Sequence, residues 1–210
     1  MILALLSDTH GKHRSVNVPE CDIVLHAGDV SHFGDKAAVH DFVEWLYEQP
    51  ARYKVFIAGN MDYFAEAHES LLRSMLPPGV FYLQNESLTL GGITLYGAPQ
   101  TPRYHNTAFN VNRGKALAAY WQHIPDDTDI LITHGPPYGI LDTTRYGEQV
   151  GDRMLAEHVL RVSPKLHLFG HIHEASGQHE TDRTRYVNAA IVDADYRPVK
   201  SPVLLDWAAL

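Results

Sequence analysis

The stretch Ile23-Val24-Leu25-His26-Ala27-Gly28-Asp29 decides the fold of this chain. It is a short, mostly apolar and β-branched run, which is typical of a strand buried in the core of an open sheet. Gly28 allows the sharp turn that ends such a strand, and Asp29 then lies at the strand's carboxyl end. On its own, a glycine followed by an aspartate indicates no more than a turn. Its significance comes from repetition of the pattern along the chain.

An apolar run that ends in polar side chains able to bind metal occurs at four further places. These runs are residues 4–6, 55–57, 130–132 and 166–169. In open α/β sheets, ligands bind beyond the carboxyl ends of the strands, so we expect the polar residues to converge on one place. The candidate metal ligands are Asp8, His10, Asp29, Asn60, His134, His171 and His173.

These side chains make little physical sense together without metal ions. Carboxylates and imidazoles at the edge of a core lose water, and each needs a partner that offsets the cost of burial. A ligand set of imidazole, carboxylate and amide oxygen without a thiolate favours Mn, Fe, Zn or Co over a structural zinc site or a calcium cage. The set is too large for one tetrahedral ion. We therefore predict two divalent metal ions, with Mn favoured, that share a bridging carboxylate.

The charge of this predicted site differs from that of the whole chain, which has a formal net charge of -8 at pH 7. Two divalent ions that face only Asp8 and Asp29 leave the pocket positive, so it attracts an anion. A phosphoester oxygen would bind both ions while a bridging hydroxide attacks phosphorus. A small phosphoester is thus the expected substrate. The acidic composition, without any basic run, argues against stable binding of nucleic acid.

Length and composition predict a single domain over residues 1–210. A chain of 210 residues with 45% hydrophobic residues can form one core, and no shift in composition suggests a boundary. The first apolar run is too short for a signal peptide or a membrane span, so we expect a cytoplasmic protein without membrane contact. The single cysteine, Cys21, has no disulfide partner and is predicted to pack as a small apolar residue. The oligomeric state stays open.

The spacing of apolar residues and the turn signals predict the other elements. Helices are expected at residues 35–48, 65–75, 113–122 and 151–162. Further strands are expected at residues 53–57, 80–83, 87–90, 93–96, 185–187 and 202–206. Residues 97–112 show neither period, and we interpret them as a lid that faces the substrate, with a packed loop as the alternative. The remaining histidines, such as His13, His40, His158 and His179, are expected at the surface.

The strand ends, taken together, resemble the ordered motifs of the calcineurin-like metallophosphoesterases. The matching motifs are Asp8-Thr9-His10, Gly28-Asp29, Gly59-Asn60-Met61-Asp62, His134-Gly135 and Gly170-His171-Ile172-His173. This resemblance covers nearly the whole chain and implies a four-layer α/β-sandwich with two central mixed β-sheets flanked by helices. It also implies the metal ligands: Asp8, His10, Asp29 and His173 on one ion, and Asp29, Asn60, His134 and His171 on the other.

A second resemblance is to the metallophosphoesterase-domain-containing phosphodiesterases. It is carried by Leu95-Tyr96-Gly97-Ala98-Pro99, Phe109-Asn110, Arg113-Gly114 and Thr133-His134-Gly135-Pro136-Pro137. One residue departs from the wider family, which usually has a histidine in place of Met61. That histidine is taken to protonate the leaving group, which a thioether cannot do. We therefore expect diesters with acidic leaving groups as substrates.

The expected function is that of a dinuclear metal-dependent phosphodiesterase acting on small nucleotide-like or other organic phosphodiesters. The catalytic candidates are Asn60, Asp62 and His134, of which Asp62 is expected to hold its loop by hydrogen bonds. The candidates for substrate contact are Asn60, Arg103, His105, Asn110, Arg113 and Arg145. One alternative is a phosphomonoesterase or protein phosphatase in which another histidine, such as His32 or His105, serves as the acid. The other is a metal-binding scaffold with little activity.

Overall fold

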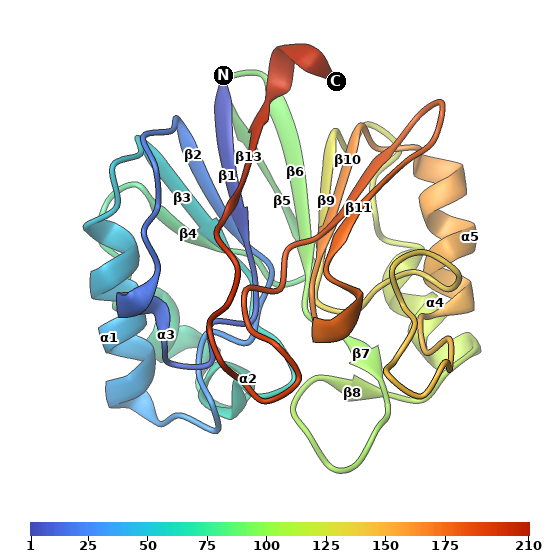
Figure 1. The fold of residues 1–210 in the computed structure, drawn as a ribbon, viewed down its shortest axis with the longest axis horizontal. Helices are drawn as coiled ribbons and strands as arrows, with labels where there is room; N and C mark the ends of the chain where they lie inside the picture. The colour runs from blue at the N-terminus through green and yellow to red at the C-terminus, as the bar shows by residue number, and fades with distance from the viewer.

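The computed structural model describes all 210 residues of the chain. Two mixed β-sheets face each other in the centre of the molecule, and helices cover the outer face of each sheet (Figure 1). This arrangement confirms the predicted α/β fold with two central mixed sheets. The segments that follow the parallel strands emerge at one edge of both sheets, which is the lower edge in Figure 1.

The first sheet contains five strands in the order β13-β1-β2-β3-β4. Its parallel strands are β1 (Ile2–Leu6), β2 (Ile23–His26), β3 (Tyr53–Phe56) and β4 (Val80–Tyr82). The last strand of the chain, β13 (Val203–Asp206), pairs with β1 in the antiparallel direction. Because β1, β2 and β3 run parallel, the segments that follow them emerge at the same edge of the sheet.

The second sheet contains six strands in the order β11-β12-β10-β9-β6-β5. Its parallel strands are β6 (Ile93–Ala98), β9 (Ile130–Thr133), β10 (Leu166–Phe169) and β12 (Arg185–Asn188). Antiparallel strands β5 (Glu86–Leu90) and β11 (Gly177–Glu180) form its two edges. The crossovers from β6 to β9 and from β9 to β10 contain α4 (Lys115–Trp121) and α5 (Arg153–Val162), whereas the one from β10 to β12 contains η2 (His173–Ala175) and β11.

Alternation of side chains along each strand produces three separate cores. From β1, Leu3 and Leu5 pack between the two sheets, whereas Ala4 and Leu6 pack against the helices of the first sheet. The strands of the second sheet divide their side chains in the same way. Strands that are buried on both faces have continuous apolar runs rather than an alternating pattern. This is why the strand runs were recognisable in the sequence.

Polar caps fix the start of the long helices. On the outside of the first sheet, α1 (Lys36–Tyr47) begins after Asp35, whose side chain accepts hydrogen bonds from the N–H groups of Ala37 and Ala38. On the second sheet, α4 (Lys115–Trp121) packs beside α5 (Arg153–Val162). Asp152 caps α5 by accepting a hydrogen bond from the N–H of Leu155. No helix has the length and apolar character that crossing a membrane requires.

The prediction of one helix over residues 65–75 is wrong. The segment forms two short helices, α2 (Tyr63–Ala67) and α3 (Glu69–Ser74), with His68 between them at φ -138 and ψ 42. Each helix is held by its own distant contact. The Tyr63 hydroxyl donates to the carbonyl of Asn106, and the Arg73 guanidinium donates to the carbonyl of Tyr82. These tertiary contacts outweigh the helical propensity of the segment.

Three smaller features also differ from the sequence prediction. Strand β11 was missed, because it is a mostly exposed edge strand without an apolar pattern. The loop over residues 97–112 contains a short pairing of β7 (Thr101–Pro102) with β8 (Asn110–Val111). His13 is buried rather than at the surface: it lies in η1 (His13–Ser15), packs on Phe42 and Trp45, and places Nε2 2.9 Å from Asp41 Oδ2. The remaining short helices are η2 (His173–Ala175) and η3 (Trp207–Ala209).

Candidate metal centre

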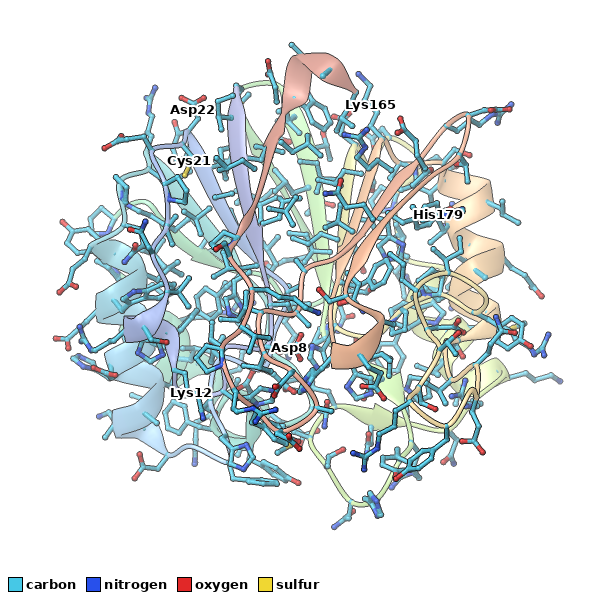
Figure 2. The ribbon with its side chains drawn as sticks, viewed as in Figure 1. Asp8, Lys12, Cys21, Asp22, Lys165 and His179 are labelled. Carbon is cyan, nitrogen blue, oxygen red and sulfur yellow. The ribbon has the colours of Figure 1, made fainter.

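The predicted ligands all lie at the edge where the parallel strands of both sheets end. The first sheet contributes Asp8 and His10 after β1, Asp29 after β2 and Asn60 after β3. The second sheet contributes His134 after β9, and His171 and His173 after β10. Figure 2 shows Asp8 at this edge, whereas Cys21, Asp22 and Lys165 lie at the opposite end of the strands. Cys21 is partly buried and packs against a hydrophobic core.

Two clusters of ligand atoms form there. Asp8, His10 and His173 make one cluster, and Asp29, His134 and His171 make the other; within each, the ligand atoms lie within 4.8 Å of one another. In the first cluster, Nε2 of His10 is 3.2 Å from Nε2 of His173, which in turn is 3.3 Å from Asp8 Oδ1. Every member of both clusters except His171 is buried. Each cluster combines side chains from both sheets.

Asp29 lies between the two clusters. Its Oδ2 atom is 3.3 Å from Nε2 of His134 in its own cluster and 3.7 Å from Nε2 of His10 in the other cluster. Asn60 joins the second cluster, because its Oδ1 atom is 3.0 Å from Nε2 of His134. The position of Asp29 is the one that a bridging carboxylate between two ions requires.

The backbone at this edge is unusual. Asp8, His10, Asp29 and His171 have φ values of 57°, 45°, 54° and 68°, in the left-handed region that residues other than glycine rarely adopt. Such conformations cost of order 1–3 kcal/mol each and cluster at functional sites. All four of these residues are members of the two clusters.

Glycines allow the strand ends to approach one another closely. A Cβ atom on Gly28 would lie 2.6 Å from the carbonyl oxygen of Ala58 and 2.7 Å from Nδ1 of His134. A Cβ on Gly59 would overlap Asp29, and one on Gly170 would overlap Asp8. The glycines of the sequence motifs therefore leave space for the carboxylates rather than serving only as turn residues.

Hydrogen bonds behind the clusters fix the orientation of the ligands. Nδ1 of His134 donates to the carbonyl of Ala27 at 2.9 Å, and Nδ1 of His173 donates to the carbonyl of Asp193 at 3.2 Å. With the proton on Nδ1, the lone pair of Nε2 points into the cluster, as in metal-binding histidines. The N–H of Met61 donates to Asp29 Oδ1 at 2.8 Å, which leaves Oδ2 for the clusters.

The donor set fits a pair of divalent ions. Oδ1 of Asp8 is buried and accepts no hydrogen bond. The Nε2 atoms of His10 and His173 face each other, and so do Nε2 of His134 and Oδ1 of Asn60. With each imidazole neutral and its proton on Nδ1, these facing nitrogen and oxygen atoms would have no proton to share, and a cation between them would satisfy both.

The pKa shifts of Asp8 and His134 both reflect attraction between carboxylates and imidazoles, whereas that of His171 reflects burial. Burial opposes the ionisation of Asp8, but the neighbouring imidazoles of His173 and His134 hold its pKa well below the usual range. Burial also disfavours a charged His134, yet the carboxylates of Asp29 and Asp8 raise its pKa to about 9. Burial lowers the pKa of His171 to about 4. The clusters thus form a buried, anionic environment that favours positive charge.

A pocket of about 430 Å³ opens above both clusters. Its floor includes His10, Asp29, Asn60, His171 and His173, and Met61 lies beside them. Its rim is mostly aromatic and consists of Phe33, Tyr63, Tyr104, His105 and Tyr196. Of the predicted substrate contacts, Asn60 and His105 therefore line this pocket. A neighbouring groove shares Tyr104 and His171 with it and is lined by Arg103.

Asp62 does not face the pocket. It is fully buried and accepts hydrogen bonds from the backbone N–H groups of Gly59, Val30 and Ser31 at 2.8, 3.1 and 2.9 Å, and from the Ser31 hydroxyl at 2.8 Å. Burial and the charge of Asp29 raise its pKa to about 7. Its contacts join the turn after β2 to the turn after β3, so it acts on the site by positioning both turns.

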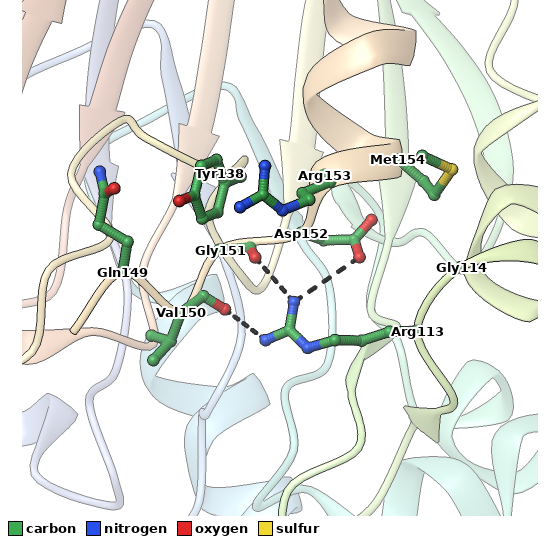
Figure 3. A pocket seen from close by; sticks show the side chains of 9 residues that line it. All are labelled: Arg113, Gly114, Tyr138, Gln149, Val150, Gly151, Asp152, Arg153 and Met154. Carbon is green, nitrogen blue, oxygen red and sulfur yellow. Dashed lines mark hydrogen bonds and ion pairs between the residues drawn. The ribbon is translucent and has the colours of Figure 1, made fainter.

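Two of the predicted substrate contacts are engaged elsewhere. The Arg113 guanidinium donates to the carbonyls of Gly151 and Val150 at 2.7 and 2.6 Å and lies near Asp152 (Figure 3). It fixes the loop before α5 and lines the cavity there, and it also lines the neighbouring groove that contains Arg103 and His171. The Asn110 amide donates to the carbonyls of Tyr104 and His105 and so shapes the rim loop.

Most of the aromatic rim has no signal in the sequence. Tyr196 lies in the connection between β12 and β13, and its ring centroid is 4.8 Å from that of His10 and 5.3 Å from that of His173. Phe33 and Tyr63 contact each other, and Phe33 also contacts His32. Phe33 and Tyr196 come from loops and Tyr63 from the start of α2, and none of them belongs to a ligand motif, so only the folded chain brings them together. Arg145 lies over the ring of Tyr146, outside this pocket.

Comparison with known proteins agrees with this geometry. Residues 1–175 match the family described as calcineurin-like phosphoesterase. The chain belongs to this family, and it is a metallophosphoesterase with two candidate metal sites. The resemblance seen in the strand-end motifs is thereby confirmed.

Individual relatives support both the family and the fold. Metallophosphoesterase domain-containing protein 1 of Homo sapiens is 37% identical over 225 residues, which cover 96% of this chain and 69% of the human protein. TT1561 of Thermus thermophilus has a TM-score of 0.59 at 14% identity, covering 89% of this chain and 88% of that one. GAP50, the anchor in the inner membrane complex of Plasmodium, has a TM-score of 0.53 at 14% identity, covering 91% and 71%. The two solved structures bear on the fold alone.

Proposed function

We propose that this protein is a dinuclear metal-dependent phosphodiesterase that hydrolyses small organic phosphodiesters, with Mn as the favoured metal. The observation that carries the proposal is the pair of ligand clusters on either side of Asp29, at the floor of a pocket open to solvent. When bound, a pair of divalent ions supplies Lewis acidity and makes a hydrolytic nucleophile available near neutral pH.

The chain's own residues contribute orientation and selectivity. Asn60 lines the pocket beside His134, so its amide N–H is available to a phosphoryl oxygen. His105 belongs to a rim loop held in one shape, because the carbonyls of residues 104, 105 and 106 all accept hydrogen bonds from Asn110 or Tyr63. Its side chain is therefore positioned to contact the organic part of a substrate.

Met61 bears on the leaving group of the proposed substrate. It lines the pocket next to Asn60, where its thioether has no proton to give a departing oxygen. A phosphoester with an acidic leaving group needs little protonation to depart, whereas a basic alkoxide needs an acid. The site therefore favours diesters of acidic alcohols or phenols.

The test is an assay of the Mn-loaded protein with bis(p-nitrophenyl) phosphate and with p-nitrophenyl phosphate. We expect turnover of the diester that exceeds turnover of the monoester, is lost with a chelator and returns when Mn is added. A faster monoester reaction would establish a phosphomonoesterase instead. Full metal content without hydrolysis of either compound would favour the metal-binding scaffold.

A further inference from the structure

The connection between β12 and β13 brings an additional side chain to the metal centre. Figure 1 shows this connection running down to the lower edge of the sheets before the chain returns as β13. Val192 pairs with Pro198 across its base, so residues 193–197 form a small closed turn. The turn lies beyond residues 1–175, the part of the chain that matches the family. Its contribution to the site was therefore not implied by the family motifs.

Hydrogen bonds hold this turn in one conformation. Oδ1 of Asp193 accepts from the N–H groups of Asp195 and Arg197, both at 2.9 Å. The Asp193 N–H donates to the carbonyl of Arg197 at 2.9 Å, and the Arg197 guanidinium donates to Asp193 Oδ2 at 2.9 Å. Tyr196 has a φ of 60°, which is uncommon for a bulky residue and is maintained only where the surroundings impose it.

The same turn is connected directly to a metal-ligand candidate. The carbonyl of Asp193 accepts the N–H of Tyr196 at 3.0 Å and the Nδ1–H of His173 at 3.2 Å. Lys200, which follows the turn, donates to the carbonyl of His173 at 3.2 Å. The position of Tyr196 is thus fixed relative to His173 rather than being that of an independent surface loop.

The Tyr196 ring covers one side of the first cluster. It meets His10 and His173 edge-to-face, with interplanar angles of 80° and 86°, and it also contacts His32 at a centroid distance of 5.0 Å. Tyr196 lines the pocket above the clusters. The contacts of the Tyr196 side chain with His10, His32 and His173 are made by its ring, which leaves the hydroxyl available to a ligand in the pocket.

We propose that the Tyr196 hydroxyl donates a hydrogen bond to an oxygen of the phosphoester that lies above the cluster of Asp8, His10 and His173. The assignment rests on the proposed function, because it names a protein contact of that same site. It supplies a hydrogen-bond donor to the same pocket that Met61 lines, where the thioether offers none. The tyrosine stays neutral, and no proton is transferred in this contact.

The experiment compares Tyr196→Phe with Tyr196→Ala in the full-length, Mn-loaded protein. The phenylalanine variant keeps the ring against His10 and His173 and removes only the hydroxyl, whereas the alanine variant removes both. Tyr47→Phe is the matched control, because Tyr47 is exposed on α1 on the outer face of the first sheet. For each protein we would measure the Kd of inorganic phosphate, the metal content, the melting temperature, and kcat and KM for the diester.

We expect Tyr196→Phe to retain wild-type metal content and melting temperature while its Kd for phosphate rises by about tenfold or more, the effect of losing one hydrogen bond to a charged group. The Tyr196→Ala variant should also lose metal. The proposal is overturned if the phenylalanine variant binds phosphate as tightly as wild type, if its affinity falls only together with metal content, or if wild-type protein binds no phosphate. Phosphate binding that depends on Tyr196 in a protein without diesterase activity would reject the proposed function and leave this contact standing.

Discussion

The two sheets contribute different chemistry to the metal centre. The first sheet supplies both carboxylates, Asp8 and Asp29, together with Asn60 and His10, whereas the second sheet supplies only the imidazoles of His134, His171 and His173. Neither sheet alone has the charge and the geometry to hold a pair of divalent ions. Each cluster becomes complete only when the sheets pack against each other through their shared core. Metal binding and the packing of the sheets should therefore be thermodynamically coupled.

The sheets also share a feature behind the ligands. Each has a buried histidine whose Nε2 atom contacts a threonine hydroxyl at the strand end: His26 with Thr9 at 3.1 Å in the first sheet, and His167 with Thr133 at 2.9 Å in the second. The two differ at Nδ1. The N–H of Gly28 donates to Nδ1 of His26 at 3.2 Å, whereas Nδ1 of His167 has no partner. The histidine–threonine pair therefore also holds a backbone turn in the first sheet, at Gly28, but not in the second sheet.

The largest effect is expected from Asp29→Asn, because Asp29 is the first-sheet residue that reaches both clusters. The substitution keeps the shape of the side chain but removes its negative charge. Turnover should fall by about 1000-fold, the scale of losing one preorganised electrostatic contact at a reaction centre. Metal content should also fall, as measured by elemental analysis after gel filtration.

Asp182→Asn is the control for that experiment, because Asp182 is an exposed carboxylate in the turn between β11 and β12. It should leave rate and metal content unchanged. If Asp29→Asn keeps the wild-type rate with two metal equivalents, the two clusters are not joined through Asp29.

Met61→His is expected to have the next largest effect, and its direction is a gain. The N–H of residue 61 still donates to Asp29 Oδ1, so the substitution changes only the side chain that lines the pocket. For diesters with basic leaving groups, kcat/KM should rise by about 100-fold, the lower end of what general acid catalysis contributes. Bis(p-nitrophenyl) phosphate should change little. The measurement is the dependence of log kcat/KM on leaving-group pKa, with Met61→Leu as the control. An unchanged slope would mean that another residue already serves as acid.

Most of the fold and the ligand set could be predicted from the sequence, because both depend on local signals. Buried strands have apolar runs such as Ile130-Leu131-Ile132, and the polar residue after each run identifies the edge. The aromatic rim could not be predicted, since Tyr196 and Phe33 come from loops whose positions depend on distant contacts. Burial of His13 depends in the same way on its packing against α1. The hydrogen bonds of Arg113 could not be predicted either: it lines the groove that contains His171, and its guanidinium donates to the backbone carbonyls of Gly151 and Val150.

Removal of the metals should lower the melting temperature, because the ions join the ligands of the two sheets. At a free metal concentration of about 100 times Kd, one site contributes about 2.7 kcal/mol. For a chain of this size, that corresponds to a decrease of about 5–10 °C per site. Scanning calorimetry with and without chelator measures this decrease in melting temperature. The decrease should be smaller in the Asp29→Asn variant than in wild type. A melting temperature that is the same with and without chelator would show that the sheets pack independently of the centre, and an equal decrease in wild type and variant would show that Asp29 does not contribute to the coupling.

The smallest effect concerns the two buried histidines. Burial lowers the pKa of His26 and of His167 from 6.5 to about 3. As pH falls from 6.5 toward 3, the unfolded chain binds a proton at each of these positions and the folded chain does not, so folding stability decreases with falling pH. Replacing either histidine by leucine should reduce this slope by up to about 1.4 kcal/mol per pH unit. Urea denaturation of the metal-free protein at several pH values measures it.

At neutral pH the variants His26→Leu and His167→Leu should differ in their free energy of unfolding. In His26→Leu the buried N–H of Gly28 loses its acceptor, which costs about 1–3 kcal/mol beyond the change in packing. In His167→Leu the Thr133 hydroxyl still donates to the carbonyl of Gly135, so no buried donor is left without a partner. Loss of the buried histidine should therefore destabilise the protein more in the first sheet than in the second. Because Gly28 precedes Asp29, His26→Leu should also weaken metal binding. Equal destabilisation of the two variants would mean that the Gly28 turn does not depend on His26.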